Sequence, residues 1–118
     1  MSRPGLPHFP GASLRRMIAL IAAATLAAPT FGAHSTAYCL RGRMSDGTYT
    51  RWGSAASNRH PLGTRIRLRR RGPGGLRTWI IRDRIGWGSE LDFWQPTCSA
   101  ARRWGRRHVT YRIVRRRS

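Results

Sequence analysis

Residues 65–83 read RIRLRRRGPGGLRTWIIRD and contain two β-type stretches around a turn. Between Arg65 and Arg69 the apolar side chains alternate with arginines at a period of two, which predicts a strand with one buried face. The apolar run TWII within 78–83 predicts a second strand. The Gly-rich and Pro-containing segment 70–75 between them predicts a flexible hairpin loop. This part of the chain therefore favours β-structure.

Comparable signals lie on both sides of this hairpin. Further strands are predicted at 35–40, 48–50, 90–94 and 109–114, with turns at 45–47 and 61–64. Thr97 is a typical N-cap for a short helix that runs through 99–104 and ends at Gly105. The 118 residues are enough for one small domain. About six short strands and one helix predict a mainly β fold, a small closed barrel.

The first thirty-three residues resemble a secretory signal peptide. Residues 1–16 are polar and carry three arginines, residues 17–28 form an apolar run, and 29–33 supply small residues at the exit. The run is shorter than the roughly 20 residues that span a bilayer. An uncleaved membrane anchor and a buried Ala-rich helix are the alternatives. Cleavage after Ala28, Gly32 or Ala33 fits the pattern, and a start at Met17 would shorten the basic segment.

The charge of the chain is very one-sided. The sequence has 23 basic residues, all of them Arg, against 4 acidic ones, with a net charge of +19. Such a charge favours binding to nucleic acid or to an anionic membrane surface, but a signal peptide argues against a cytoplasmic location. We therefore expect a secreted or cell-envelope protein, held by peptidoglycan or another anionic wall polymer, with no nucleic-acid partner and no membrane span after cleavage. Residues 115–118 form a basic tail.

Two cysteines, Cys39 and Cys98, lie 59 positions apart. In an exported protein they predict a disulfide that contributes on the order of 4 kcal/mol in the chain-entropy model. Two separate buried thiols are the alternative. The histidines lack the spacing of zinc ligands, so no metal site is expected.

The four acidic residues are informative because they are so few. Asp46 belongs to a predicted turn. Asp83 ends a predicted strand, and Glu90 and Asp92 are two positions apart, so on a strand they face the same side. A carboxyl beside a second carboxylate, or shielded from water, has a raised pKa and can donate a proton near neutral pH. The alternative is that these acids only form ion pairs with the many arginines.

Most of the region 34–114 resembles the 3D (Asp-Asp-Asp) domain, a small relative of the rare lipoprotein A-like and membrane-bound lytic transglycosylase A-type double-psi β-barrels. The residues that carry the resemblance are Thr36-Ala37-Tyr38, Pro61-Leu62-Gly63-Thr64, Ile81-Arg82-Asp83 with Gly86, Leu91-Asp92-Phe93, and Ala100-Ala101 with residues 104–110. The resemblance implies a six-stranded double-psi β-barrel with one short helix. It also implies an activity on peptidoglycan that needs no cofactor.

Asp83 and Asp92 match the second and third aspartates of the family pattern. Its first aspartate lies five residues before the Pro of the Pro-Leu-Gly-Thr turn, where this chain has Ala56. Asp92 is then the predicted acid/base of a lytic-transglycosylase or hydrolase-type cleavage, and Asp83 raises its pKa or orients the sugar. The residues predicted to contact substrate are Glu90, Asn58, Ser57, Trp87 and Trp94, of which the two tryptophans have core packing as their alternative role. A non-catalytic, expansin-like wall-binding module is the alternative function, and the absence of the first aspartate fits it.

Overall fold

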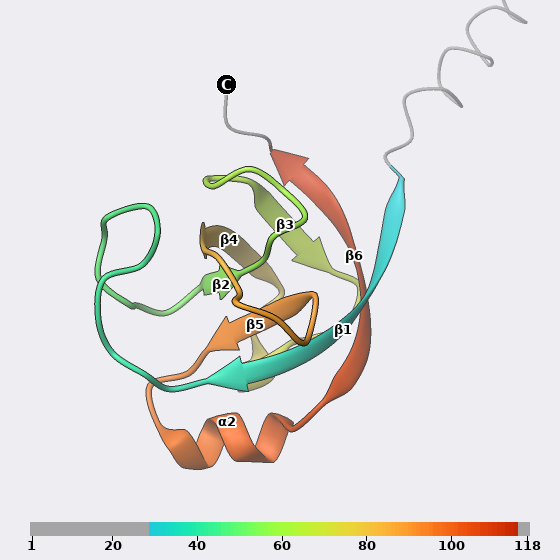
Figure 1. The fold of residues 1–118 in the computed structure, drawn as a ribbon. Coiled ribbons are helices and arrows are strands. Elements are labelled where there is room, and N and C mark those ends of the chain that lie inside the picture. Colours follow the sequence, from blue (N-terminus) through green and yellow to red (C-terminus); the bar gives the residue numbers. More distant parts are fainter. Residues whose placement is uncertain (1–28, 116–118) are drawn as a thin grey trace, which may run out of the picture.

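Six strands close into a barrel in the computed structural model, which describes residues 29–115 (Figure 1). Around the barrel the strands follow the order β1-β5-β2-β4-β3-β6. The strands are β1 (Thr30–Tyr38), β2 (Ser54–Ala56), β3 (Arg65–Leu68), β4 (Thr78–Asp83), β5 (Leu91–Trp94) and β6 (Arg107–Arg115). The β1–β5 and β2–β4 pairs are parallel, and the other four pairs are antiparallel. The predicted mainly β barrel is confirmed.

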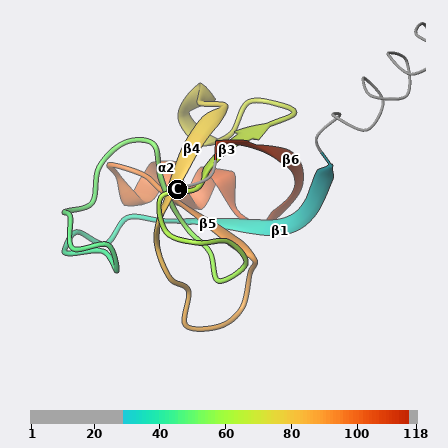
Figure 2. The same cartoon turned by 90° about the horizontal axis from the view of Figure 1, so that it is seen from above.

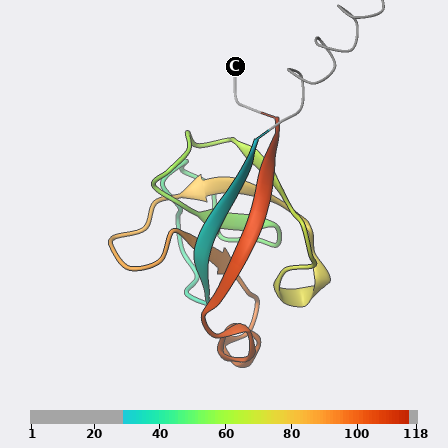
Figure 3. The same cartoon turned by 90° about the vertical axis from the view of Figure 1, so that its right-hand side faces the viewer.

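The longest pairing joins β1 and β6, which lie side by side along the barrel (Figure 3). The prediction placed the start of the first strand at residue 35, but β1 begins at Thr30. The reason is tertiary: the register runs from Thr30 opposite Arg112 to Ser35 opposite Arg107, and Ala33 is buried at 1% exposure. Cleavage after Ala28 would leave β1 whole, whereas cleavage after Ala33 would remove its first four residues.

Residues 1–28 of the predicted signal peptide and 116–118 of the predicted tail lie outside the described residues. Within residues 29–115, no helix is long and apolar enough to cross a membrane.

The interior of the barrel is filled by alternate side chains of the strands, as the period-two patterns predict. Trp79 of β4 contacts Phe93 of β5 at 4.7 Å between ring centroids, and Phe93 meets Trp104 edge to face at 5.9 Å. Trp104 closes one end of the barrel, and its Nε1 donates a 3.0 Å hydrogen bond to Oγ of Ser35. These contacts join the strands to the helix around one core.

The single described helix, α2 (Cys98–Trp104), agrees with the prediction at both ends. The Thr97 side chain accepts a 3.1 Å hydrogen bond from the Ala100 amide, and Gly105 adopts a φ of 64° at the C-cap. The predicted hairpin loop after β3 is also present and contains a short 3-10 turn, η1 (Pro73–Gly75).

The prediction was wrong about the strand between residues 45 and 60. Residues 48–50 form no strand and contribute one isolated bridge, Arg43 to Tyr49, while β2 lies further along at Ser54–Ala56. The Ser-Ala-Ala sequence has little β propensity. It is a strand because it pairs with β4 on one side and with β5 on the other, and a local pattern does not reveal such partners.

Candidate active site

The two predicted catalytic aspartates lie on either side of β2. Ala56 is opposite Asp83 in the parallel β2–β4 pair and opposite Asp92 in the antiparallel β2–β5 pair. Side chains directly opposite each other in a sheet point to the same face. Leu91 and Phe93 point into the core, so Asp92 points away from it. The β2–β4 register shifts between Ala55 and Ala56, which brings Asp83 opposite Ala56. The sheet therefore places Asp83 and Asp92 on either side of β2, close enough for the charge of Asp83 to raise the pKa of Asp92.

Asp92 is half-buried and is held by β1 and by the end of the 84–90 loop. The Thr36 hydroxyl donates a 3.0 Å hydrogen bond to Oδ1 of Asp92 and lies 2.7 Å from Oγ of Ser89. Burial raises the pKa of Asp92, the Thr36 hydrogen bond opposes this, and the nearby charge of Asp83 raises the pKa further. The net direction is upward, which is the shift that a general acid requires.

Asp83 is oriented by the segment that follows β1. Its Oδ1 accepts hydrogen bonds from the Ser45 amide at 3.0 Å, from the Ser45 hydroxyl at 2.7 Å and from the Arg84 amide at 2.8 Å. The ion pairs among residues 29–115 are Arg59–Glu90 and Arg82–Asp46. Asp83 and Asp92 thus form no ion pair with an arginine in the described part of the chain.

Tyr38 belongs to the same cluster, although it was not among the predicted site residues. It is two positions beyond Thr36 on β1, so both side chains point to the same face. Burial raises the pKa of the Tyr38 phenol, and the charges of Asp83 and Asp92 raise it further. The buried hydroxyl has no hydrogen-bond partner among the described residues. The alternation within Thr36-Ala37-Tyr38 was the signal that could have identified it.

Glu90 was expected to share a strand face with Asp92, but it lies outside β5. It precedes β5, pairs with Arg59, and accepts a 2.7 Å hydrogen bond from the His34 amide. That hydrogen bond and the Arg59 charge lower the pKa of Glu90. Glu90 lines a hollow of about 280 Å³ together with Asn58, Arg59 and Ser89. Since Ser89 also contacts Thr36, the hollow lies next to the aspartate cluster.

Ser57 and Asn58, the two polar residues predicted to bind sugar, hold the loops around this hollow. Asn58 bonds to the Ile85 backbone twice, through Nδ2 to the carbonyl at 2.6 Å and through Oδ1 to the amide at 3.0 Å. Ser57 is fully buried, and its Oγ accepts a 3.1 Å hydrogen bond from the Arg59 amide. Figure 2 shows the 84–90 loop projecting alongside the segment that follows β2. Of these two residues, Asn58 lines the hollow and Ser57 does not.

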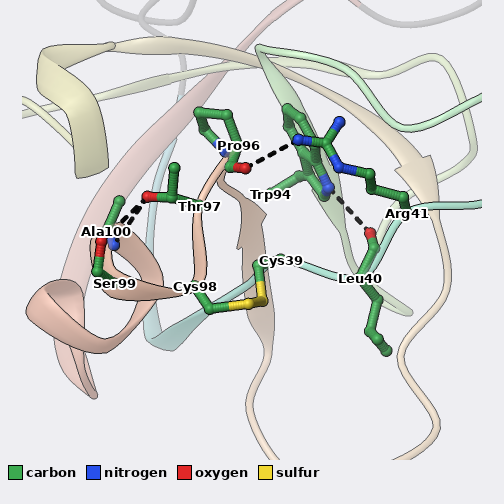
Figure 4. Close-up of a disulfide and its surroundings, with 9 residues drawn as sticks. All are labelled: Cys39, Leu40, Arg41, Trp94, Pro96, Thr97, Cys98, Ser99 and Ala100. Carbon is green, nitrogen blue, oxygen red and sulfur yellow. Dashed lines mark hydrogen bonds between the residues drawn. A yellow bond between two sulfur atoms is a disulfide. The ribbon is translucent and has the colours of Figure 1, made fainter.

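The two predicted stacking residues are separated by the fold. Trp87 is 92% exposed in the 84–90 loop, whereas Trp94 is 4% exposed. The Trp94 Nε1 donates a 3.0 Å hydrogen bond to the Leu40 carbonyl, and the Arg41 guanidinium lies over its ring (Figure 4). Trp94 therefore occupies the packing position that was its alternative role, and Trp87 is available for stacking.

The predicted disulfide is present between Cys39, directly after β1, and Cys98, the first residue of α2 (Figure 4). It anchors the end of β1 that carries Thr36 and Tyr38. Within residues 29–115, no group of three His, Cys, Asp or Glu side chains is placed to hold a metal ion.

Comparisons of the chain with protein-family models, with curated proteins and with solved structures find no match. The site itself provides one half-buried carboxyl of raised pKa, a second carboxylate beside it and an adjacent hollow.

Proposed function

We propose that this protein is an exported cell-wall enzyme that cleaves O-glycosyl bonds of peptidoglycan in the manner of a lytic transglycosylase. The observation that carries the proposal is the position of Asp92, half-buried beside Asp83 with a raised pKa. The three positions that correspond to the aspartates of the 3D domain, Ala56 included, lie on adjacent strands, which supports the resemblance. The mixed parallel and antiparallel pairing supports a double-psi barrel.

The proposed reaction needs one titrating carboxyl. The protonated Asp92 donates its proton to the glycosidic oxygen as the bond from that oxygen to C1 of the muramyl sugar breaks. The Asp92 carboxylate then accepts the proton of the muramyl 6-hydroxyl, whose oxygen bonds to C1 and closes a 1,6-anhydro ring. The proton returns to Asp92, so the cycle is balanced without water. Burial, with the added charge of Asp83, keeps the pKa of Asp92 high, and Trp87 stacks on a sugar face.

Export of the protein is supported by two features. The basic, apolar and small-residue segments of 1–33 have the order of a signal peptide, and the Cys39–Cys98 disulfide favours an oxidising compartment. Peptidoglycan is the substrate that such a location makes accessible.

The test is digestion of purified sacculi by the wild type and by Asp92→Asn, with Arg102→Gln as a control that changes one exposed charged residue on α2, outside the site. We expect the wild type and the control to release muropeptides with 1,6-anhydro ends and Asp92→Asn to release none. Reducing ends instead would identify a hydrolase. Equal release by Asp92→Asn would exclude Asp92 as the acid.

A non-catalytic, expansin-like wall-binding module is the second candidate, favoured by the alanine at position 56. It predicts that the wild type sediments with sacculi and releases no soluble product. The same digestion and its pellet distinguish the two functions.

A further inference from the structure

A groove lined with arginines crosses the outer face of β4, β3 and β6. It consists of two adjoining hollows of about 540 and 220 Å³, which share Arg67 and Arg77. Besides Arg82, the arginines that line it are Arg65, Arg67, Arg69, Arg71, Arg77 and Arg112. We call these two hollows the basic groove. Neither Asp83 nor Asp92 lines it, so it is a second site, separate from the candidate active site.

The charges of the basic groove are largely uncompensated, and three of its arginines have a side-chain hydrogen bond or ion pair among the described residues. Arg82 is paired with Asp46 at 3.3 Å, and it is the one lining arginine with an ion pair among the described residues. Arg71 donates to the Gly75 carbonyl at 3.0 Å, and Arg77 donates to the Leu68 carbonyl at 3.1 Å. Bonds to neutral carbonyls orient a guanidinium without cancelling its charge, which leaves it able to attract an anion.

The strand register places two of these arginines against each other. Arg67 of β3 is directly opposite Arg112 of β6. Like charges directly opposite in an antiparallel pair destabilise a sheet. An anion bound between the two guanidinium groups would remove that repulsion, so the register itself favours a negatively charged ligand at this point.

The ligand must be extended and must offer an apolar or sugar-like face. Arg65 and Arg67 lie on the same face of β3, about 7 Å apart along the strand, and the groove continues from them to Arg112. At the other end Trp52, 49% exposed, borders the groove and packs edge to face on Trp79. The backbone of Gly74 lies so close to Trp52 that a Cβ there would fall 2.2 Å from the ring. Trp52 is thus fixed as a surface on which a sugar or polyol unit can stack.

We propose that the basic groove binds a linear phosphodiester polymer of the cell envelope, built from sugar or polyol phosphate units. Guanidinium groups bind phosphate oxygens in a bidentate manner, and Trp52 contacts the unit between phosphates. The disulfide favours a compartment outside the cytoplasm, which selects an envelope polymer over nucleic acid. Binding here requires no cleavage, so it does not depend on the function proposed for Asp92.

The test measures binding of fluorescently labelled poly(glycerol phosphate) to the full, oxidised chain over a range of salt concentrations. The double variant Arg67→Gln/Arg112→Gln removes the opposed pair, and Arg102→Gln/Arg106→Gln removes two exposed charges outside the groove. We expect the first variant to raise the Kd by about five- to tenfold and to reduce the salt dependence, and the control to change the Kd less than about twofold. Thermal unfolding should show Arg67→Gln/Arg112→Gln at least as stable as the wild type, because repulsion is relieved.

Three results would overturn the proposal. Equal loss of affinity in both variants would mean that net charge alone attracts the polymer. Equal or tighter binding of a single-stranded oligonucleotide of the same charge would identify a nucleic-acid surface. Equal binding of polygalacturonate would show that the groove recognises carboxylates rather than phosphodiesters. Because no digestion is measured, each result is independent of whether Asp92 is catalytic.

Discussion

Thr36 and Asp92 lie opposite each other on the parallel strands β1 and β5, and the Thr36 hydroxyl donates a 3.0 Å hydrogen bond to the Asp92 carboxylate. This single contact lowers the pKa of a carboxyl that burial and Asp83 otherwise raise. The pKa of Asp92 is therefore a balance between the Thr36 hydroxyl on the neighbouring strand β1, which lowers it, and burial together with the charge of Asp83 on β4, which raise it.

Replacing Thr36 by Val should raise the pKa of Asp92, because the carboxylate loses its hydrogen-bond donor while its burial is retained. If protonated Asp92 is the active form, the fall of activity at high pH should move to higher pH. The measurement is an NMR titration of the ¹³C-labelled Asp carboxyl carbons together with a pH profile of muropeptide release. Thr78→Val on β4 is the control. A pKa of Asp92 that stays unchanged or falls would contradict this role for Thr36.

Asp92→Asn should make the fold more stable than the wild type at neutral pH. The folded pKa of Asp92 is raised above its unfolded value, so the native state binds the proton more tightly. Its contribution to stability is present below the unfolded pKa and is lost as pH rises through the folded pKa. The Asp92→Asn variant does not ionise at this position, so it does not lose this stability as the pH rises. Urea unfolding at several pH values should show the difference in free energy growing with pH, and a constant difference would exclude a raised pKa.

Ala56→Asp should destabilise the protein most at high pH. Ala56 is 3% exposed and lies between the strands of Asp83 and Asp92, so an ionised carboxylate there is buried beside two like charges. We expect a loss of about 3–5 kcal/mol at pH 7 and a smaller one near pH 4, where the new carboxyl is protonated. Ala56→Asn is the matched control, with a loss that does not vary with pH. Wild-type stability of Ala56→Asp at pH 7 would show that the position is open to water.

Reduction of the Cys39–Cys98 bond should lower the free energy of unfolding by about 4 kcal/mol, because the bond closes a long loop in the unfolded chain. The check is urea unfolding with and without a reductant, with Cys39→Ala/Cys98→Ala under both conditions. The double variant should not respond to the reductant. A wild type that is equally stable in both conditions would mean that the bond adds nothing to the fold.

A chain that begins at Pro29 should fold, whereas one that begins at His34 should lose at least about 3 kcal/mol. The shorter chain lacks Phe31, which stacks on Tyr111 at 5.3 Å, and the buried Ala33. Thermal unfolding of the two proteins measures the difference. For the same reason we expect N-terminal sequencing of the exported protein to begin at Pro29, and a mature start at His34 would contradict this.

Two strands and the helix were predictable from sequence. The 65–69 stretch, predicted from its alternation, and the 78–83 stretch, predicted from its apolar run, appear as β3 and β4 within one residue, and the helix begins and ends where Thr97 and Gly105 indicated. In each case the signal is local, since it depends on neighbouring side chains or on a capping residue.

The elements that were missed depend on partners distant in sequence. β2 is three small residues whose only reason to be extended is the pair of strands on either side. The first four residues beyond Pro29 resemble the exit of a signal peptide and become strand through pairing with β6. The residues of the candidate active site also depend on partners that are distant in sequence. Asp83 and Asp92 were predicted from their rarity and from the resemblance. Thr36 and Tyr38 share a face by alternation along β1, but the parallel register of β1 and β5 is what brings that face to Asp92, and no local pattern reveals this register.

The position of β2 also has a consequence for the order in which the protein folds. Ser54–Ala56 precedes both of its partner strands in the sequence, so on a chain emerging N-terminus first it can pair with β4 once Asp83 has followed, and with β5 only after Phe93. Pairings between distant segments form slowly and late. Asp83 and Asp92 lie on either side of Ala56 only when β2 has paired with both β4 and β5. A partly translocated or partly folded chain thus contains Asp83 and Asp92 but does not hold them next to each other. The raised pKa of Asp92, on which the proposed cleavage depends, arises only after the sheet around β2 has formed.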